Sequence, residues 1–365
     1  MTAPTPRPGI LDIAPYVPGS SKAPGVDKIY KLSSNESALG ASEKAIEAYR
    51  ASGGDLHLYP DGSATALREK IAEIYGLDAA RIVCGAGSDE ILQLLTRAYC
   101  GPGDNIVQSD HGFLVYALAA KSCGAEVRFA PEKNLTADID AMLAEVDEKT
   151  RIVFIANPNN PTGTYVPESE LRRLREHLPT EVILVIDAAY AEYMEEDDYI
   201  GGETMVDENS NVVMTRTFSK IYGLGGVRLG WGYFSPEMAD IINRIRGPFN
   251  VNAPAIAAGV AALEDQDFVS RNRIFNREQR DWMAQQLGGM GLNFCRSFGN
   301  FILVEFPDEP DKTAAEVQAF LKSRGVIVRE MGAYKLGSWL RISIGDKEGN
   351  AAAIDALREL FGNAG

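Results

Sequence analysis

The chain has 365 residues, of which 45% are hydrophobic and 24% are charged, and its formal net charge is −15. A chain of this length exceeds one ordinary hydrophobic core, so we expect a globular protein of two domains. The negative charge argues against nucleic-acid binding, and no apolar run is long enough to span a membrane.

The N-terminal residues 1–31 are rich in proline and glycine, which favours an arm that lies on another surface. They lack the basic region and apolar core of a signal peptide, so we expect a cytoplasmic protein. The four cysteines and three histidines show no metal-ligand or redox spacing. We therefore expect reduced thiols and no metal site.

From residue 42 to residue 214, helical patterns alternate with short apolar runs. We expect strands at 81–84, 106–108, 126–129, 152–155, 182–186 and 212–214. We expect helices at 42–51, 64–75, 91–99, 115–122 and 166–177. Strands that alternate with helices pair in parallel and have both faces covered, so this pattern predicts an α/β fold with a mostly parallel central sheet.

After Gly247 the pattern changes. Residues 255–287 favour a long helix that is broken near 265–267, and such a helix could bridge two domains. Further strands are expected at 301–306, 326–328 and 339–344, with helices at 314–323 and 351–360. This C-terminal part therefore predicts a second, smaller α+β unit.

One stretch, residues 211–233, combines a nucleophile with phosphate-binding groups. A short apolar run leads into Thr217, Ser219 and Lys220, and Arg228 follows among glycines. A partly desolvated lysine has a lowered pKa and is a nucleophile for carbonyl carbons, while the hydroxyls and the arginine could bind one phosphate. This combination suggests pyridoxal phosphate bound as a Schiff base. On this stretch alone, an exposed lysine in a glycine-rich loop remains an alternative.

Three further motifs follow predicted strands, where open α/β sheets place their ligand sites. Residues 85–89 open a helix and suit a phosphate, but they lack the third glycine of the dinucleotide fingerprint. In the run 157–163, Asn160 could donate to a phenolate oxygen. Asp187, with Tyr190 three residues on, could pair with a protonated pyridine nitrogen. Each motif alone could also be an ordinary turn or a helix cap.

Taken together, these motifs resemble the fold-type I pyridoxal-phosphate aminotransferases, and within them the histidinol-phosphate aminotransferase family. The resemblance covers nearly the whole chain. The matching segments are LSSNESALG (32–40), LYPDG (58–62), GAGSDEILQLL (85–95), NPNNPTG (157–163), VIDAAYAEY (185–193), TFSKIYGLGGVRLG (217–230), RGPFNVN (246–252), GVIVREMGAY (325–334) and LRISIG (340–345). The sequence departs from many relatives at His111, where they carry proline, which we interpret as a difference in loop shape.

The resemblance implies a role for each cofactor-site residue. Lys220 would bind pyridoxal 5'-phosphate covalently and move the substrate proton, Asp187 would pair with the ring nitrogen, and Asn160 and Tyr190 would hold the ring hydroxyl. Phe113 would stack on the ring. The cofactor phosphate would be bound by Gly87, Ser88, Asp89, Thr217, Ser219 and Arg228, and by Tyr59 of a neighbouring subunit.

The resemblance also implies a homodimer with shared active sites and a substrate pocket formed by Tyr16, Asn35, Arg329 and Arg341. It implies an N-terminal arm (1–31), a segment of the small domain (32–50), a large cofactor-binding domain (51–265) and a C-terminal small domain (266–365). The implied reaction converts L-histidinol phosphate and 2-oxoglutarate to imidazole acetol phosphate and L-glutamate, in histidine biosynthesis. An aromatic amino-acid aminotransferase, a pyridoxal-phosphate lyase or decarboxylase, and a non-catalytic pyridoxal-binding regulator are the alternatives.

Overall fold

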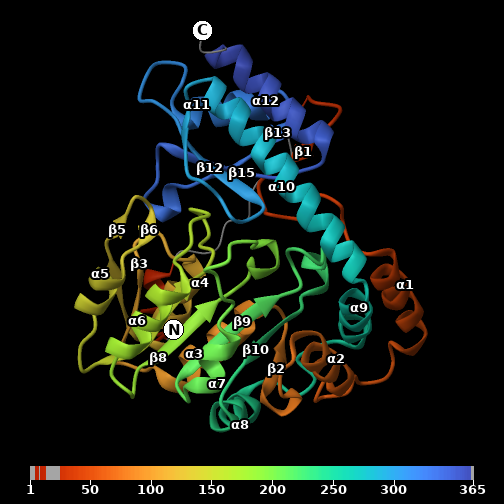
Figure 1. Cartoon of the computed structure of the whole chain (residues 1–365), viewed down its shortest axis with the longest axis vertical. Helices are drawn as coiled ribbons and strands as arrows, with labels where there is room; N and C mark the ends of the chain where they lie inside the picture. Colours follow the sequence, from red (N-terminus) through yellow and green to blue (C-terminus); the bar gives the residue numbers. More distant parts are fainter. Residues whose placement is uncertain (1–4, 8, 14–24, 363–365) are drawn as a thin grey trace.

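The structure, a computed structural model, describes residues 5–7, 9–13 and 25–362. Figure 1 shows a large sheet with helices around it in the lower part of the view and a smaller α/β unit in the upper part. In the described residues, no helix combines the length and the apolar character needed to cross a membrane.

The large sheet has seven strands in the order β2-β10-β9-β8-β7-β3-β4. These are β2 (Ile82–Gly85), β3 (Asn105–Ser109), β4 (Glu126–Ala130), β7 (Thr150–Ala156), β8 (Ile183–Asp187), β9 (Val212–Thr217) and β10 (Gly230–Tyr233). Strands β4, β3, β7, β8 and β9 pair in parallel, whereas β10 is antiparallel to both of its neighbours. The predicted mostly parallel α/β sheet is therefore confirmed.

The central strands contain continuous apolar runs because both faces of the sheet are covered. On β8, for example, Leu184 and Ile186 pack in one hydrophobic core while Ile183 and Val185 pack in the other. Successive side chains of a strand point to opposite faces, so a strand buried on both faces is apolar at every position. Because the strands are held in place by burial on both faces, their ends, which carry residues of the site, are held in place as well.

Helices cover both faces of the large sheet (Figure 1). They are α1 (Glu43–Ala51), α2 (Thr65–Tyr75), α3 (Ser88–Tyr99), α4 (Leu114–Cys123), α5 (Ile139–Ala144), α6 (Glu168–His177), α7 (Glu203–Glu208), α8 (Pro236–Ile245) and α9 (Ala253–Glu264). The predicted break near 265–267 is confirmed, because α9 ends and α10 (Gln266–Gly289) begins at Asp265. The side chain of Asp265 caps α10 by accepting from the backbone N–H of Phe268.

The smaller unit is built on an antiparallel sheet of four strands, ordered β11-β12-β15-β14. Its elements are β11 (Asn293–Phe294), β12 (Phe301–Glu305), α11 (Ala314–Ser323), β13 (Val326–Ile327), β14 (Arg329–Glu330), β15 (Trp339–Ser343) and α12 (Lys347–Phe361). Strand β1 (Tyr30–Lys31), far away in the sequence, pairs in parallel with β13. A short hairpin, β5 (Glu132–Lys133) and β6 (Thr136–Ala137), lies beyond β4.

The N-terminal segments contact both units. Arg7 donates to the carbonyl of Ser122 at the end of α4 at 2.8 Å, so the arm contacts the large unit at this residue. Leu32 packs in the core of the small unit, whereas Ala45 of α1 packs in the core of the large sheet. The predicted domain boundaries stay predictions, and these contacts show that the segment 32–50 joins the two cores.

Strand β10 and helix α8 were not expected from the sequence. In β10 the glycines alternate with Trp231 and Tyr233, which are buried in the core. A side chain at Gly230 would collide with the backbone of Ser88, so the glycine allows the start of α3 to approach the sheet closely. The glycines of this stretch gave no strand pattern in the sequence. In the structure, Gly230 is a strand position where the backbone of a neighbouring segment approaches closely.

Candidate active site

Two cavities lie at the carboxyl ends of β7, β8 and β9. The first, of about 260 Å³, is lined by Asp187, Lys220 and Arg228, among other residues. The second, of about 420 Å³, shares Lys220 and Arg228 with the first and is also lined by Arg329 and Arg341. The predicted site residues that line one or both cavities are Asn35, Ser88, Asp89, Phe113, Asn160, Asp187, Tyr190, Thr217, Ser219, Lys220, Arg228, Arg329 and Arg341.

Lys220 follows β9 and its side chain faces the first cavity. Burial, together with the nearby positive charge of Arg341, lowers the pKa of Lys220 to about 8. The ammonium nitrogen lies 5.7 Å from the centre of the Tyr190 ring. A lysine with this pKa has a substantial neutral fraction near pH 8, and the neutral amine is the nucleophilic form.

Asp187 is the last residue of β8 and is 4% exposed. Its carboxylate accepts hydrogen bonds from the hydroxyl of Tyr116 at 2.8 Å and from that of Thr215 at 3.2 Å. Burial raises the pKa of Asp187 to about 6, although these two hydrogen bonds act in the opposite direction. A buried carboxylate that borders a cavity suits a cationic partner in that cavity.

The other end of the first cavity brings together groups that suit an anion. Helix α3 begins at Ser88, so its free backbone N–H groups and the positive end of its dipole lie at the cavity. The guanidinium of Arg228 lies 3.5 Å from the hydroxyl of Ser219 and 3.4 Å from Asp89. Gly87 has a φ of 90°, and a side chain there would meet this guanidinium. Hydroxyls, helix N–H groups and an arginine together suit a phosphate group.

Phe113, Asn160 and Tyr190 form the walls between the two ends of the cavity. The amide oxygen of Asn160 accepts from Arg341 at 2.5 Å, which leaves its NH₂ group as a donor. The hydroxyl of Tyr190 accepts from the side chain of Asn35 at 2.9 Å. The position of Asn35 is set in turn by two hydrogen bonds with Ser343 of β15, each of 2.8 Å.

Arg329 and Arg341 are directly opposite each other on the adjacent antiparallel strands β14 and β15. Opposite residues of an antiparallel pair point to the same face, so both arginines border the second cavity. Arg341 is 7% exposed and donates to the carbonyl of Ser33 at 2.9 Å. The result is a strongly cationic wall beside Lys220.

Among the described residues, Gly87 and Tyr59 are predicted site residues that do not line either cavity. Tyr16 lies outside the described residues. Tyr59 is 83% exposed and stacks on the ring of Phe249 with 4.7 Å between the ring centroids. Tyr59 is not among the residues that line either cavity of its own chain, so its predicted role across a subunit boundary stays a prediction.

Behind the cavity, a buried ionic network supports the segments that carry Lys220 and Tyr190. Arg216 of β9 pairs with Glu192 at 3.1 Å and with Glu203. Its guanidinium stacks on Tyr75, whose hydroxyl bonds to Glu192 at 3.0 Å and to Tyr222 at 2.7 Å. Glu192 follows Tyr190 by two residues, and Tyr222 follows Lys220 by two residues. The sequence analysis missed this network because its members are far apart in the chain.

The sequence analysis also missed the role of Tyr116. It is fully buried, stacks on Phe154 with 4.6 Å between the centroids, and holds Asp187 from below. Tyr116 lies on the first turn of α4, three residues after Phe113, so the two side chains lie on the same side of the helix. This spacing is the sequence feature that could have indicated its role.

The fold and the site define a class of protein. A parallel sheet that presents a lysine of lowered pKa, a buried carboxylate and a phosphate site at its strand ends is typical of pyridoxal-phosphate enzymes of fold type I. The chain belongs to the family "aminotransferase class I and II", whose family model matches residues 27–357.

Three similar proteins belong to one group within that family. The chain is 54% identical to the histidinol-phosphate aminotransferase of Paramagnetospirillum magneticum, with 99% of this chain and 100% of that protein covered. It is 53% identical to that of Maricaulis maris, with 96% and 97% covered. The crystal structure of histidinol-phosphate aminotransferase from Sinorhizobium meliloti in complex with pyridoxal-5'-phosphate has a TM-score of 0.86 at 29% identity, over 92% of this chain and 91% of that one.

Proposed function

We propose that this protein transfers the amino group of L-histidinol phosphate to 2-oxoglutarate, with pyridoxal 5'-phosphate as cofactor, and forms imidazole acetol phosphate and L-glutamate. This is a step of histidine biosynthesis. The observation that carries the proposal is the pair Arg329 and Arg341, which face one cavity beside Lys220. The names of the most similar proteins support the same substrate.

The described residues fit this cofactor. The buried carboxylate of Asp187 suits the protonated ring nitrogen, and the N-terminus of α3 with Ser219 and Arg228 suits the phosphate. Phe113 offers a ring face and Asn160 a free amide donor toward the ring hydroxyl. When bound, the cofactor supplies a conjugated ring that withdraws electrons from the substrate carbon.

The protein's own groups then hold and move protons. Lys220, with its pKa lowered to about 8, can accept a proton from the substrate carbon and return it. Asp187 would keep the ring nitrogen protonated. Tyr190, held by Asn35, would donate its hydroxyl hydrogen toward the cofactor, and burial keeps Tyr190 neutral because it raises its pKa to about 12.

The two arginines suit both substrates of the proposed reaction. Histidinol phosphate has no α-carboxylate, and its negative charge lies on the phosphate. 2-Oxoglutarate carries two carboxylates. Arginine binds carboxylate and phosphate oxygens with a two-pronged donor, so one cationic wall can serve both half-reactions.

Phenylalanine and tyrosine are the competing donors. Leu114, Val115 and Leu118 line the second cavity and would accommodate a phenyl ring as well as an imidazole. The deciding experiment measures kcat/KM for histidinol phosphate, phenylalanine and tyrosine with 2-oxoglutarate as acceptor. We expect histidinol phosphate to be preferred, and a preference for phenylalanine would assign the protein to the aromatic aminotransferases.

We further infer a homodimer in which Tyr59 serves the cofactor phosphate of the other subunit. Tyr59 and its neighbours Leu56 and Leu58 are all exposed, beside Phe249, and together form an apolar surface suited to a second copy. Mixing the inactive variants Lys220→Ala and Tyr59→Asp should restore activity, since one mixed site would be intact. A fully active monomer in sedimentation would contradict this.

The proposed location is the cytoplasm. The four cysteines are free thiols in the structure, which fits a reducing compartment. Cell fractionation with an antibody to the chain tests this, and recovery in an extracellular fraction would contradict it.

A further inference from the structure

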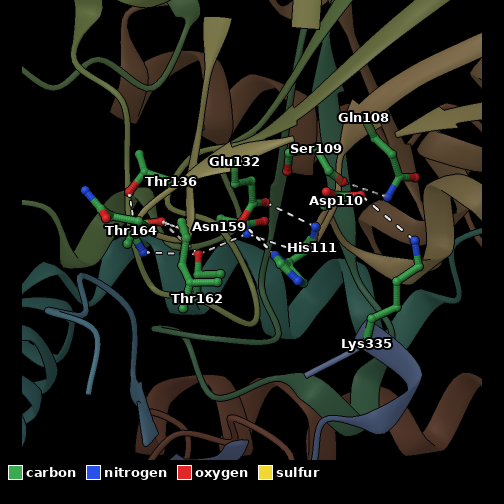
Figure 2. A network of polar contacts seen from close by, with 12 residues as sticks. Gln108, Ser109, Asp110, His111, Glu132, Thr136, Asn159, Thr162, Thr164 and Lys335 are labelled. Atoms are coloured by element: carbon green, nitrogen blue, oxygen red, sulfur yellow. Dashed lines mark hydrogen bonds and ion pairs between the residues drawn. The ribbon is translucent and has the colours of Figure 1, made fainter. Parts of the chain in front are cut away.

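The loop between β3 and α4, residues 110–113, places Phe113 at the cavity wall. Figure 2 shows that this loop is held from the side by Glu132 of the β5–β6 hairpin. One oxygen of Glu132 accepts from the backbone N–H of His111 at 3.1 Å, and the other lies 2.8 Å from the ring nitrogen Nδ1 of His111. A single carboxylate therefore holds both the backbone and the side chain of one loop residue.

This contact is buried. The side chain of Glu132 is 3% exposed and that of His111 is 15% exposed. A carboxylate can only accept hydrogen bonds, so Nδ1 of His111 carries the hydrogen in this pair. A buried carboxylate without its donors is strongly unfavourable, which ties the loop to this one position.

His111 also contacts a second wall of the cavity. Its carbonyl accepts from the side chain of Asn159 at 3.1 Å, and the same Asn159 amide donates to Thr162 at 3.0 Å. Asn159 precedes Asn160, which lines both cavities. The loop with Phe113 and the loop with Asn160 are thus connected through the backbone of His111 (Figure 2).

A second contact of the same loop is much weaker. Asp110 lies 3.9 Å from the ammonium of Lys335, whose side chain is 69% exposed. Exposed ion pairs of this kind contribute little, because water and salt screen them. Of these two ionic contacts, the buried one between His111 and Glu132 therefore contributes more to the position of the loop.

We propose that His111 and Glu132 are positioning residues for the cofactor ring: Glu132 fixes His111, which places Phe113 against one face of the ring and, through Asn159, sets the donor Asn160. Neither residue lines either cavity, so both act through others. The inference rests on the proposed function, since it requires a cofactor ring in the first cavity.

The test measures the dissociation constant of pyridoxal phosphate and the circular dichroism of the bound cofactor, which reports the tilt of its ring. His111→Ala should weaken cofactor binding roughly tenfold, the size expected for one lost charge-assisted hydrogen bond, and Glu132→Ala, which also removes the bond to the backbone of His111, should weaken it at least as much. The double variant should be little worse than Glu132→Ala, because that change already removes both contacts of the carboxylate with His111.

Conservative and control variants separate positioning from general stability. His111→Asn keeps a side-chain N–H near the place of Nδ1, so it should restore most of the affinity and the dichroism. His177→Ala changes a histidine at the end of α6 that is not part of this network and should behave as wild type. The melting temperatures of all variants show whether a loss of cofactor affinity goes together with a loss of overall stability.

The outcomes are distinct. Wild-type affinity and dichroism in His111→Ala would overturn the inference while leaving the proposed function intact. Equal weakening in His111→Ala and His111→Asn, in proportion to their melting temperatures, would also overturn it and assign the pair a purely structural role. A wild-type protein that does not bind pyridoxal phosphate would instead refute the proposed function itself.

Discussion

The two halves of the site are built in different ways. The cofactor half is formed by residues at or just beyond the ends of strands of one sheet, or at the start of a helix: Asp187 ends β8, Lys220 lies shortly after β9, and Ser88 opens α3. The substrate half combines Arg329 and Arg341 of the small sheet with Asn35 from the N-terminal segment. One half depends on local chain geometry, and the other depends on how distant segments dock.

This difference separates two kinds of specificity. A change in the cofactor half should lower the rate with every amino donor alike, because all donors use the same cofactor. A change in the substrate half should alter the ratio between donors. Substitutions in the two halves therefore test this division.

Lys220→Ala should abolish turnover with every donor, because no other group that we assign to the site is an amine. Borohydride should trap the cofactor covalently on Lys220 in the wild type, and peptide mass spectrometry locates the adduct. Lys44→Ala, at a lysine that is 61% exposed, serves as the control and should keep full activity. An adduct on any other lysine would show that the central assignment is wrong.

Asp187→Asn should lower kcat by about a hundredfold or more, because it removes the charge that keeps the ring nitrogen protonated. The loss should be similar for histidinol phosphate and phenylalanine. Asp197→Asn changes an exposed carboxyl and is the matched control. A variant of Asp187 within a few-fold of wild type would refute its role.

Arg329→Ala should change the ratio of kcat/KM between histidinol phosphate and phenylalanine by roughly ten- to a hundredfold, since a charge-assisted contact contributes about 1.5–3 kcal/mol. We expect the contact to be made to the phosphate only, so phenylalanine is comparatively spared. Arg341→Ala should damage both donors. An unchanged ratio in Arg329→Ala would contradict the division of the site into a cofactor half and a substrate half.

Tyr116→Phe should have the smallest effect. It removes one of the two hydroxyls that donate to Asp187, a loss of about 1 kcal/mol and roughly fivefold in kcat. The bond to Tyr116 lowers the pKa of Asp187, so its loss should raise that pKa further and weaken the charge. Equal losses for both donors would support the division, and a changed donor ratio would contradict it.

The cofactor half could be predicted from the sequence because strand ends of a parallel sheet meet at one edge. Once 182–186 and 212–214 are interpreted as parallel strands, Asp187 and Lys220 must lie close together. The predicted lining residues of that half are found at the cavity, except for Gly87 and for Tyr59, whose expected place is in another subunit.

The remaining features depend on tertiary contacts that no local pattern specifies. Asn35 has a φ of 52° and is held by Ser343, which is 308 positions away in the chain. In the acidic run 195–198, Glu195 pairs with Arg277 at 2.8 Å and Glu196 with Arg296 at 2.9 Å, and both partners lie far away in the sequence. Hydrophobic periodicity describes which face is buried, but it carries no information on which distant side chain completes a polar contact.

The attachment of the N-terminal segment to β15 has a consequence for biosynthesis on the ribosome. The segment around Asn35 emerges among the first parts of the chain, and its partners Arg341 and Ser343 emerge among the last. The residues of this chain assigned to the cofactor phosphate can come together while translation continues, because they lie between residues 87 and 228. The substrate wall cannot, and closing so long a loop is a slow, late event. We therefore expect the groups assigned to the cofactor to come together earlier than the groups assigned to the donor.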